Sequence, residues 1–129
     1  CGNDWIVLRL ADVYLLHAEA IMAGAESTRD LDAIASYNAI RERVGLSTLE
    51  LDGSATLTRE VLLAERRIEL AFENHRFYDL QRFGVAEQVL SEFAANNPAI
   101  NFSSTDLLLP IPQNEINVSQ GALSQNPGY

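Results

Sequence analysis

The sequence contains no lysine. All nine basic residues are arginines, set against 18 acidic residues, and the net charge is −9. Nucleic acids and anionic membrane surfaces are bound through clustered positive charge, so an acidic protein of this composition excludes nucleic acid as a partner. Arginine is favoured where a planar guanidinium must hold a carboxylate. We therefore expect several of these arginines to form structural ion pairs.

Cysteine and histidine are also scarce. A single cysteine, Cys1, cannot form an internal disulfide. The two histidines, His17 and His75, occur in His-x-Glu and Glu-x-His spacings, which place the two groups on different faces of a helix and do not match a metal-binding motif. The sequence also contains no P-loop or dinucleotide-binding fingerprint. These observations predict no metal, no cofactor and no catalytic residue.

The sequence begins Cys1-Gly2-Asn3-Asp4, which resembles the start of a processed lipoprotein. The alternative interpretation, which we favour, is that Cys1 is an interior residue of a longer chain. No apolar run is long enough to span a bilayer.

The apolar spacing predicts an all-α fold in one domain over residues 1–129. A first helix is expected over residues 5–24 and a second over 29–44, the latter started by a capping box from Ser27 to Asp30 and ended by Gly45. Together they form a helical hairpin, residues 5–46, of about the size of one tetratricopeptide-like unit. The first helix is apolar nearly all round, so we expect it to be buried on two sides.

Further helices are expected over residues 58–96. Thr58 is placed to cap a helix that runs to about Asn74, followed by helices over 76–84 and 85–96. The first of these has two opposite apolar faces, so it too is expected to be held from two sides: Val61, Ala64, Ile68, Ala71 and Phe72 form one face, and Leu63 and Leu70 the other.

The last stretch is expected to be an extended tail over residues 107–129. Pro110 and Pro112 exclude a helix around them because they remove alternate backbone donors. One helical turn is predicted over 113–118, and a tight turn with Pro127 and Gly128 at its centre.

The densest part of the sequence is residues 65–84, in which four acidic residues balance four arginines. Opposite charges recur three positions apart, as in Arg66 and Glu69 or Glu73 and Arg76, which predicts neighbouring charges on a helix. We therefore predict a structural ion-pair network, with members Glu65, Arg66, Glu69, Glu73, Arg76, Asp79 and Arg82. Two other interpretations stay open, namely a binding surface and an acid/base row formed by Glu65, Glu69 and Glu73.

Two aromatic residues, Trp5 and Tyr78, are candidates for stacking against sugar rings, because exposed flat rings can pack on sugar faces. The alternative for both residues is packing in the core.

These features together resemble the C-terminal part of the SusD/RagB family of glycan-binding outer-membrane lipoproteins. The stretches that carry the resemblance follow the family's order over nearly the whole chain: LRLADVYLLHAEA (8–20), YNAIRERVGL (37–46), LLAERRIELAFENHRFYDLQRFG (62–84), LPIPQNEI (109–116) and QNPGY (125–129). One departure is Asn74, where the family usually has glycine. Asparagine can adopt the same left-handed conformation at modest cost.

The resemblance implies a non-enzymatic role, in which oligosaccharides are captured at the extracellular face of the outer membrane and passed to a TonB-dependent transporter. It also implies a lipid anchor on an N-terminal cysteine of the full-length protein, which is not to be equated with Cys1. Sugar-contacting residues lie outside the matched motifs, so none is assigned here. The alternative function is a free-standing helical module that binds other proteins.

Overall fold

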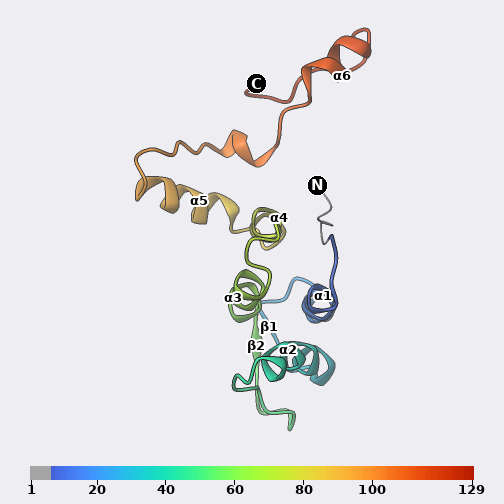
Figure 1. The fold of residues 1–129 in the computed structure, drawn as a ribbon, viewed down its shortest axis with the longest axis vertical. Helices are drawn as coiled ribbons and strands as arrows, with labels where there is room; N and C mark the ends of the chain where they lie inside the picture. Colours follow the sequence, from blue (N-terminus) through green and yellow to red (C-terminus); the bar gives the residue numbers. More distant parts are fainter. Residues whose placement is uncertain (1–6) are drawn as a thin grey trace, which may run out of the picture. The chain divides into compact units, whose positions relative to one another are not determined.

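The computed structural model describes residues 7–129, in which the regular structure is helical apart from one two-stranded sheet (Figure 1). The helices are α1 (Leu10–Met22), α2 (Leu31–Arg43), α3 (Arg59–Glu69), α4 (Arg76–Arg82), α5 (Ala86–Ala95) and α6 (Gln113–Val118), with a 3₁₀ turn η1 (Ser104–Leu107). The all-α prediction is confirmed.

The chain forms two compact units, the first ending at Asp79 and the second comprising Leu80–Tyr129. The single domain over 1–129 stays a prediction.

The core of the first unit lies between α1 and α2, which pack side by side as the predicted hairpin (Figure 1). The residues buried there recur at helical spacing on both helices: Ala11, Leu15, Ala18 and Met22 on α1, and Ala33, Ile34, Tyr37 and Ile40 on α2. Burying a large side chain of this kind stabilises the fold by about 1.5–3 kcal/mol. The hairpin therefore holds most of the apolar stabilisation of the first unit.

Helix α1 is shorter than predicted. It begins at Leu10, because the backbone of Arg9 is extended (φ −138°, ψ 162°). Trp5, the predicted first residue, lies outside the described residues. The prediction that this helix is buried on two sides was wrong, since Val13 and Leu16 on its outer face are exposed. The face of α1 toward α2 and α3 makes its main packing contacts.

Helix α2 begins at Leu31, two residues later than predicted. Asp30, rather than Ser27, is the N-cap, and its carboxylate accepts hydrogen bonds from the amides of Asp32 and Ala33. Ser27 instead lies in strand β1 (Ser27–Thr28), which pairs antiparallel with β2 (Leu57–Thr58). The pairing joins the segment before α2 to the segment before α3. This small sheet was not predicted, because two-residue strands carry no periodicity.

The end of α2 follows the prediction. Gly45 is left-handed (φ 72°) and its amide donates to the carbonyl of Glu42, while Leu46 donates to Arg41. This is the glycine-dependent helix end expected from the sequence. The loop that follows is held by the buried amide of Asn38, which donates to the Leu49 carbonyl at 2.7 Å and accepts from its N–H at 2.9 Å.

Helix α3 starts where predicted, with the Thr58 hydroxyl accepting from the amide of Val61. It ends at Glu69 rather than near Asn74, because Phe72 (φ 67°) and Asn74 (φ 62°) are both left-handed and break the helical backbone. Asn74 thus adopts the conformation expected of it. A left-handed phenylalanine is uncommon and signals local strain.

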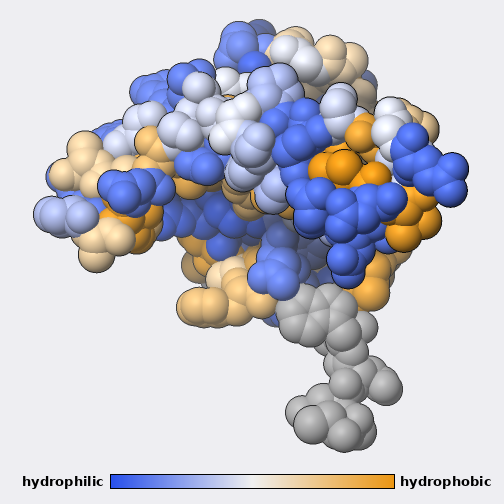
Figure 2. Space-filling view, turned by 90° about the horizontal axis from the view of Figure 1, so that it is seen from above, coloured by the Kyte–Doolittle hydropathy of each residue, from blue (hydrophilic) through white to orange (hydrophobic). Residues whose placement is uncertain are grey.

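The burial of α3 was predicted wrongly. The buried apolar residues of this helix and its end are Leu62 and Leu70, whereas Ile68 is 73% exposed and Phe72 fully exposed. The helix has apolar residues on more than one face, so periodicity alone could not decide which face packs. Figure 2 shows apolar surface, in orange, exposed among hydrophilic surface on one face of the molecule.

The second unit consists of α5 and a tail of mostly irregular backbone. Helix α6 has the predicted bounds, 113–118, and the end of the chain forms the predicted turn, in which the amide of Tyr129 donates to the Asn126 carbonyl. Gly128 (φ 98°) is required there, since a Cβ atom would lie 2.3 Å from Cγ2 of Thr105. Tyr129 itself is half exposed.

Candidate functional site

The charged block at residues 65–79 forms its ion pairs with other helices. Arg66 is the centre of one cluster: it is 1% exposed, and its Nη2 lies 2.8 Å from Asp12 on α1 and 2.9 Å from Asp79 on α4. Both carboxylates are buried as well. Three helices therefore meet at one guanidinium, whose removal would strand two buried negative charges.

A second cluster joins the end of α3 to the start of α1. The Arg9 Nη1 lies 2.6 Å from Oε1 of Glu69, and its Nε lies 2.8 Å from Oε2 of Glu73. Arg9 also donates to the Glu69 carbonyl. Arg43, from the last turn of α2, lies 2.7 Å from Oε2 of Glu69. The hydrogen bond between Arg9 and Glu73 is the main cause that raises the pKa of Arg9 and lowers the pKa of Glu73.

Glu65 belongs to a third cluster with α2. Its Oε2 lies 2.7 Å from Nη1 of Arg41, and the Arg41 guanidinium lies over the Tyr37 ring at 5.6 Å from the centroid. The hydrogen bond to Glu65 raises the pKa of Arg41. Burial, and then the nearby Glu65 charge, raise the pKa of the Tyr37 hydroxyl.

Two of the predicted pairs do not form. Arg66 and Glu69 share α3, but each binds partners on other helices, and Glu73 and Arg76 are separated by the left-handed Asn74, so helical spacing does not apply. Arg76 instead reaches the Leu63 carbonyl at 3.4 Å. That the network as a whole stabilises the fold stays a prediction.

The structure adds partners that the sequence analysis did not include in the network, namely Arg9, Asp12, Arg41 and Arg43. Their signal in the sequence was the absence of lysine together with arginines on the first two helices. Distances between helices were needed to assign them. Arg82, by contrast, lies over the Phe83 ring at 5.9 Å, a contact within the second unit.

The acid/base hypothesis for Glu65, Glu69 and Glu73 gains no support from this geometry. Each of the three carboxylates accepts a hydrogen bond from at least one arginine, so each already has a cationic partner. The arrangement can hold helices together or present a charged surface.

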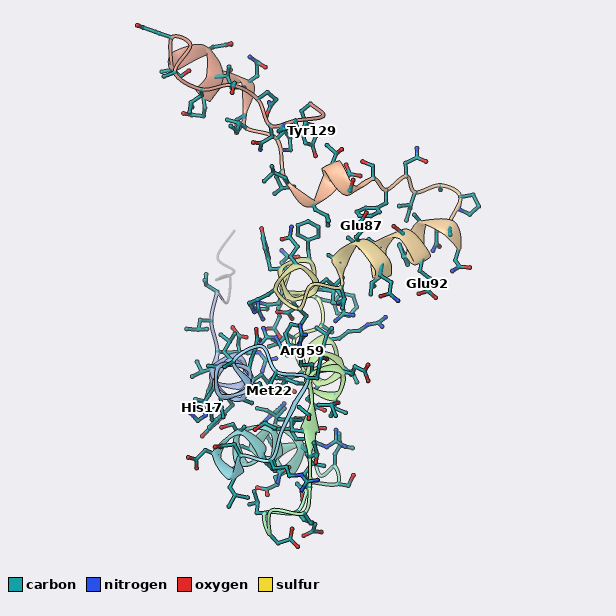
Figure 3. All side chains as sticks on the ribbon, turned by 180° about the vertical axis from the view of Figure 1, so that it is seen from behind. His17, Met22, Arg59, Glu87, Glu92 and Tyr129 are labelled. Atoms are coloured by element: carbon teal, nitrogen blue, oxygen red, sulfur yellow. The ribbon has the colours of Figure 1, made fainter. Side chains whose placement is uncertain are left out.

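His17, labelled on α1 in Figure 3, has Nδ1 2.8 Å from the hydroxyl of Ser36, which itself donates to the Asp32 carbonyl. Among residues 7–129, no three His, Cys, Asp or Glu side chains lie close enough to hold a metal ion. Likewise, none of the described helices is both long and apolar enough to cross a membrane.

Of the two aromatic candidates, Trp5 lies outside the described residues, as does Cys1. Tyr78 is 56% exposed and contacts Phe77 edge to face, with the ring centroids 5.7 Å apart. Tyr78 is therefore not a core residue, and its ring is accessible.

The cavities of the first unit include two that border the charged clusters. The larger, of about 370 Å³, is at the break between α3 and α4, and its lining includes three arginines: Arg66, Arg67, Leu70, Ala71, Phe72, Asn74, Arg76 and Asp79. The smaller, of about 280 Å³, lies between α1 and α2 and is mainly apolar, with Arg9 and Arg43 on its wall. The first combines three arginines with the fully exposed ring of Phe72, and we call it the arginine cavity.

Comparison with known proteins places this arrangement in a family. The chain is 35% identical to SusD-like protein P2 of Formosa agariphila, in an alignment that covers 99% of this chain and 26% of that protein. It is 37% identical to SusD-like protein P25 of the same organism, with 99% and 25% covered. The chain thus spans about a quarter of the length of these relatives.

A solved structure gives the same result for the fold. Surface glycan-binding protein A from Bacteroides thetaiotaomicron superposes with a TM-score of 0.73 at 33% identity, covering 98% of this chain and 25% of that one. The model of the SusD family matches residues 2–129, nearly the whole sequence. The chain therefore belongs to the SusD family.

Proposed function

We propose that the protein binds oligosaccharides as a non-enzymatic component of a glycan-uptake system. The observation that carries the proposal is the family match over residues 2–129. The name of the superposed structure, a surface glycan-binding protein, supports the same activity.

A binding role without catalysis fits the charged clusters. Glycoside hydrolysis needs two carboxyl groups free to act on the sugar. Glu65, Glu69 and Glu73 are all held by arginines, so these three carboxylates do not provide such a pair.

Further parts of the proposal rest on the family. We propose that the whole protein lies at the extracellular face of the outer membrane, held by a lipid anchor, and delivers its glycan to a TonB-dependent transporter. A gene for such a transporter directly beside the gene for this protein, with glycosidase genes nearby, would support this assignment and suggest the polysaccharide.

The direct test is calorimetric titration of the chain with a panel of neutral and acidic oligosaccharides. We expect a saturable heat with at least one oligosaccharide and no release of reducing sugar during incubation. Release of reducing sugar by the intact protein would overturn the non-enzymatic assignment. A chain that binds no member of the panel would count against glycan binding by this part of the protein.

A second function is favoured by the exposed apolar residues of α3. Val61, Ile68 and Phe72 are accessible on the surface of the first unit, and exposed apolar patches mark protein-binding sites. A helical module that binds other proteins would use this surface. Titration with amphipathic helical peptides separates the two functions, since peptide binding without any oligosaccharide binding would favour the module.

A further inference from the structure

The arginine cavity is a positively charged site in an acidic protein. Arg66, Arg67 and Arg76 line it, and Asp79 is the acidic residue in its lining, whereas the whole sequence carries a net charge of −9. Its volume, about 370 Å³, falls in the range of ligand pockets, about 300–1,000 Å³. A local excess of positive charge at such a site attracts anions.

Two hydrogen-bond donors of Arg66 have no acceptor among the described residues. Arg66 is 1% exposed and paired through Nη2, yet its Nε and Nη1 have no hydrogen-bond partner within residues 7–129. Buried donors without an acceptor are costly, about 1–3 kcal/mol each and more when charged. Both donor atoms are enclosed by protein, so Arg66 contributes its charge to the cavity, and hydrogen bonds to a bound anion would come from Arg67 and Arg76.

Arg67 and Arg76 supply charge that is not neutralised by an ion pair in the described part of the chain. Arg67 is exposed, and Arg76 makes one long hydrogen bond, 3.4 Å, to the Leu63 carbonyl. Burial lowers the pKa of Arg76, and the repulsion of Arg67 lowers it further. The charge of Asp79 acts in the opposite sense but does not reverse the lowering, so a further negative charge beside the two guanidinium groups would stabilise them.

The wall also has an apolar part, beside the polar side chain of Asn74. Leu70 is buried beneath it, and Phe72 is fully exposed in a left-handed backbone conformation (φ 67°). Such strain is retained where the surrounding structure imposes it, and it is often found at binding sites. A cation cluster beside an exposed aromatic ring matches a ligand that carries both a carboxylate and an apolar ring face.

We propose that the arginine cavity binds the carboxylate of a uronate residue in an acidic oligosaccharide, with the sugar ring against Phe72. The planar guanidinium fork matches a carboxylate better than a neutral hydroxyl, and the charged hydrogen bonds are the stronger ones. This inference rests on the proposed function, of which it names the substrate class, and it places a sugar contact within residues 62–84, where the family resemblance assigned none.

The test compares two arginine substitutions in the full chain. Arg67→Gln removes a cation from the cavity, and because Arg67 is exposed without an ion pair in the described chain, the variant should keep its fold. Arg29→Gln is the matched control, since Arg29 is also exposed and bonds only the Thr56 hydroxyl among the contacts found. Each variant is titrated calorimetrically with a trigalacturonate and with a neutral trisaccharide, and circular dichroism checks its helical content.

We expect the wild type and Arg29→Gln to bind trigalacturonate, and Arg67→Gln to bind it about tenfold more weakly, the loss of one charged hydrogen bond. Raising the salt concentration should weaken the wild-type binding. A Phe72→Ala variant, which leaves the charges in place, should also weaken it.

Three outcomes would overturn the inference in different ways. Equal binding of the acidic and neutral sugars, or no effect of Arg67→Gln, would leave the proposed function standing and remove its acidic substrate class. Binding of neither sugar would count against both proposals.

Discussion

The two units of the chain are stabilised by different interactions. The first unit has an apolar core between α1 and α2 and a buried guanidinium, Arg66, that joins three helices. In the second unit, none of the described residues after Ala86 is buried, and the tail is held by side chains that bond the backbone. Gln125 accepts from the amide of Ile111 at 2.8 Å and donates to its carbonyl at 2.9 Å, as a neighbouring strand would.

The difference shows two ways to hold a chain without long strands. Helices bury apolar faces and can then bury charges in pairs. An irregular tail has no such core, so its order depends on single amide side chains and on one glycine. Loss of a charge should therefore damage the first unit most, whereas loss of a backbone partner should damage the second.

The largest effect is expected at Arg66. Arg66→Ala strands the buried Asp12 and Asp79, so the free energy of unfolding should fall by about 3–5 kcal/mol. Urea denaturation followed by circular dichroism measures it. Arg29→Ala, at an exposed arginine, should cost less than about 1 kcal/mol. A change near zero in the free energy of unfolding of Arg66→Ala would mean that water solvates the charges of this cluster.

Glu69 comes next. Glu69→Ala removes the shared acceptor of Arg9 and Arg43, and we expect a loss of more than about 2 kcal/mol. Arg76→Ala, which removes one long hydrogen bond and a partly buried charge, should cost less. Equal losses of unfolding free energy for Glu69→Ala and Arg76→Ala, in the same urea experiment, would support the ion pair between Glu73 and Arg76 that the sequence predicted.

In the second unit, the sensitive position is Gly128. Gly128→Ala places a Cβ atom against Thr105 and forces a left-handed alanine, so the tail should lose about 2 kcal/mol of local stability. Amide hydrogen exchange over residues 104–129 should speed up, and α1–α3 should be unaffected. The control is Gly53→Ala, also left-handed (φ 84°) but with no atom within 4 Å of the added Cβ. Equal acceleration of exchange around each substituted glycine would attribute the effect to backbone strain alone.

The smallest effect concerns pH. The hydrogen bond from Arg9 lowers the pKa of Glu73 below its ordinary value of 4.5. A carboxylate with a depressed pKa stabilises the fold above the unfolded-state pKa, and that contribution is lost as the pH falls through the folded-state pKa. The melting-temperature difference between wild type and Glu73→Gln should therefore shrink below about pH 4.5. A difference that stays constant down to pH 3 would contradict this.

Several local features were predictable because they depend on neighbours in sequence. The Thr58 cap, the helix end at Gly45, the bounds of α6 and the turn at Gly128 all follow from side-chain or φ requirements within a few residues. The early end of α3 was partly visible in Asn74, but a left-handed Phe72 was not, since phenylalanine gives no local reason for that conformation.

The ion pairs show most clearly what spacing in the sequence could not predict. The sequence identified Glu65, Glu69 and Asp79 as members of an ion-pair network, and spacing suggested Arg66 as the partner of Glu69. The structure pairs them with Arg41, with Arg9 and Arg43, and with Arg66. Long arginine side chains reach across helices, so proximity along the chain does not decide which carboxylate they bind.

By itself, the sequence determined the helical class, the family motifs and the caps and turns, because each depends on residues close together in the chain. The tertiary structure alone decided which face of α3 is buried, which arginine binds which carboxylate, and that three arginines line one cavity. These properties depend on distances between helices, and apolar spacing on a single helix does not contain them.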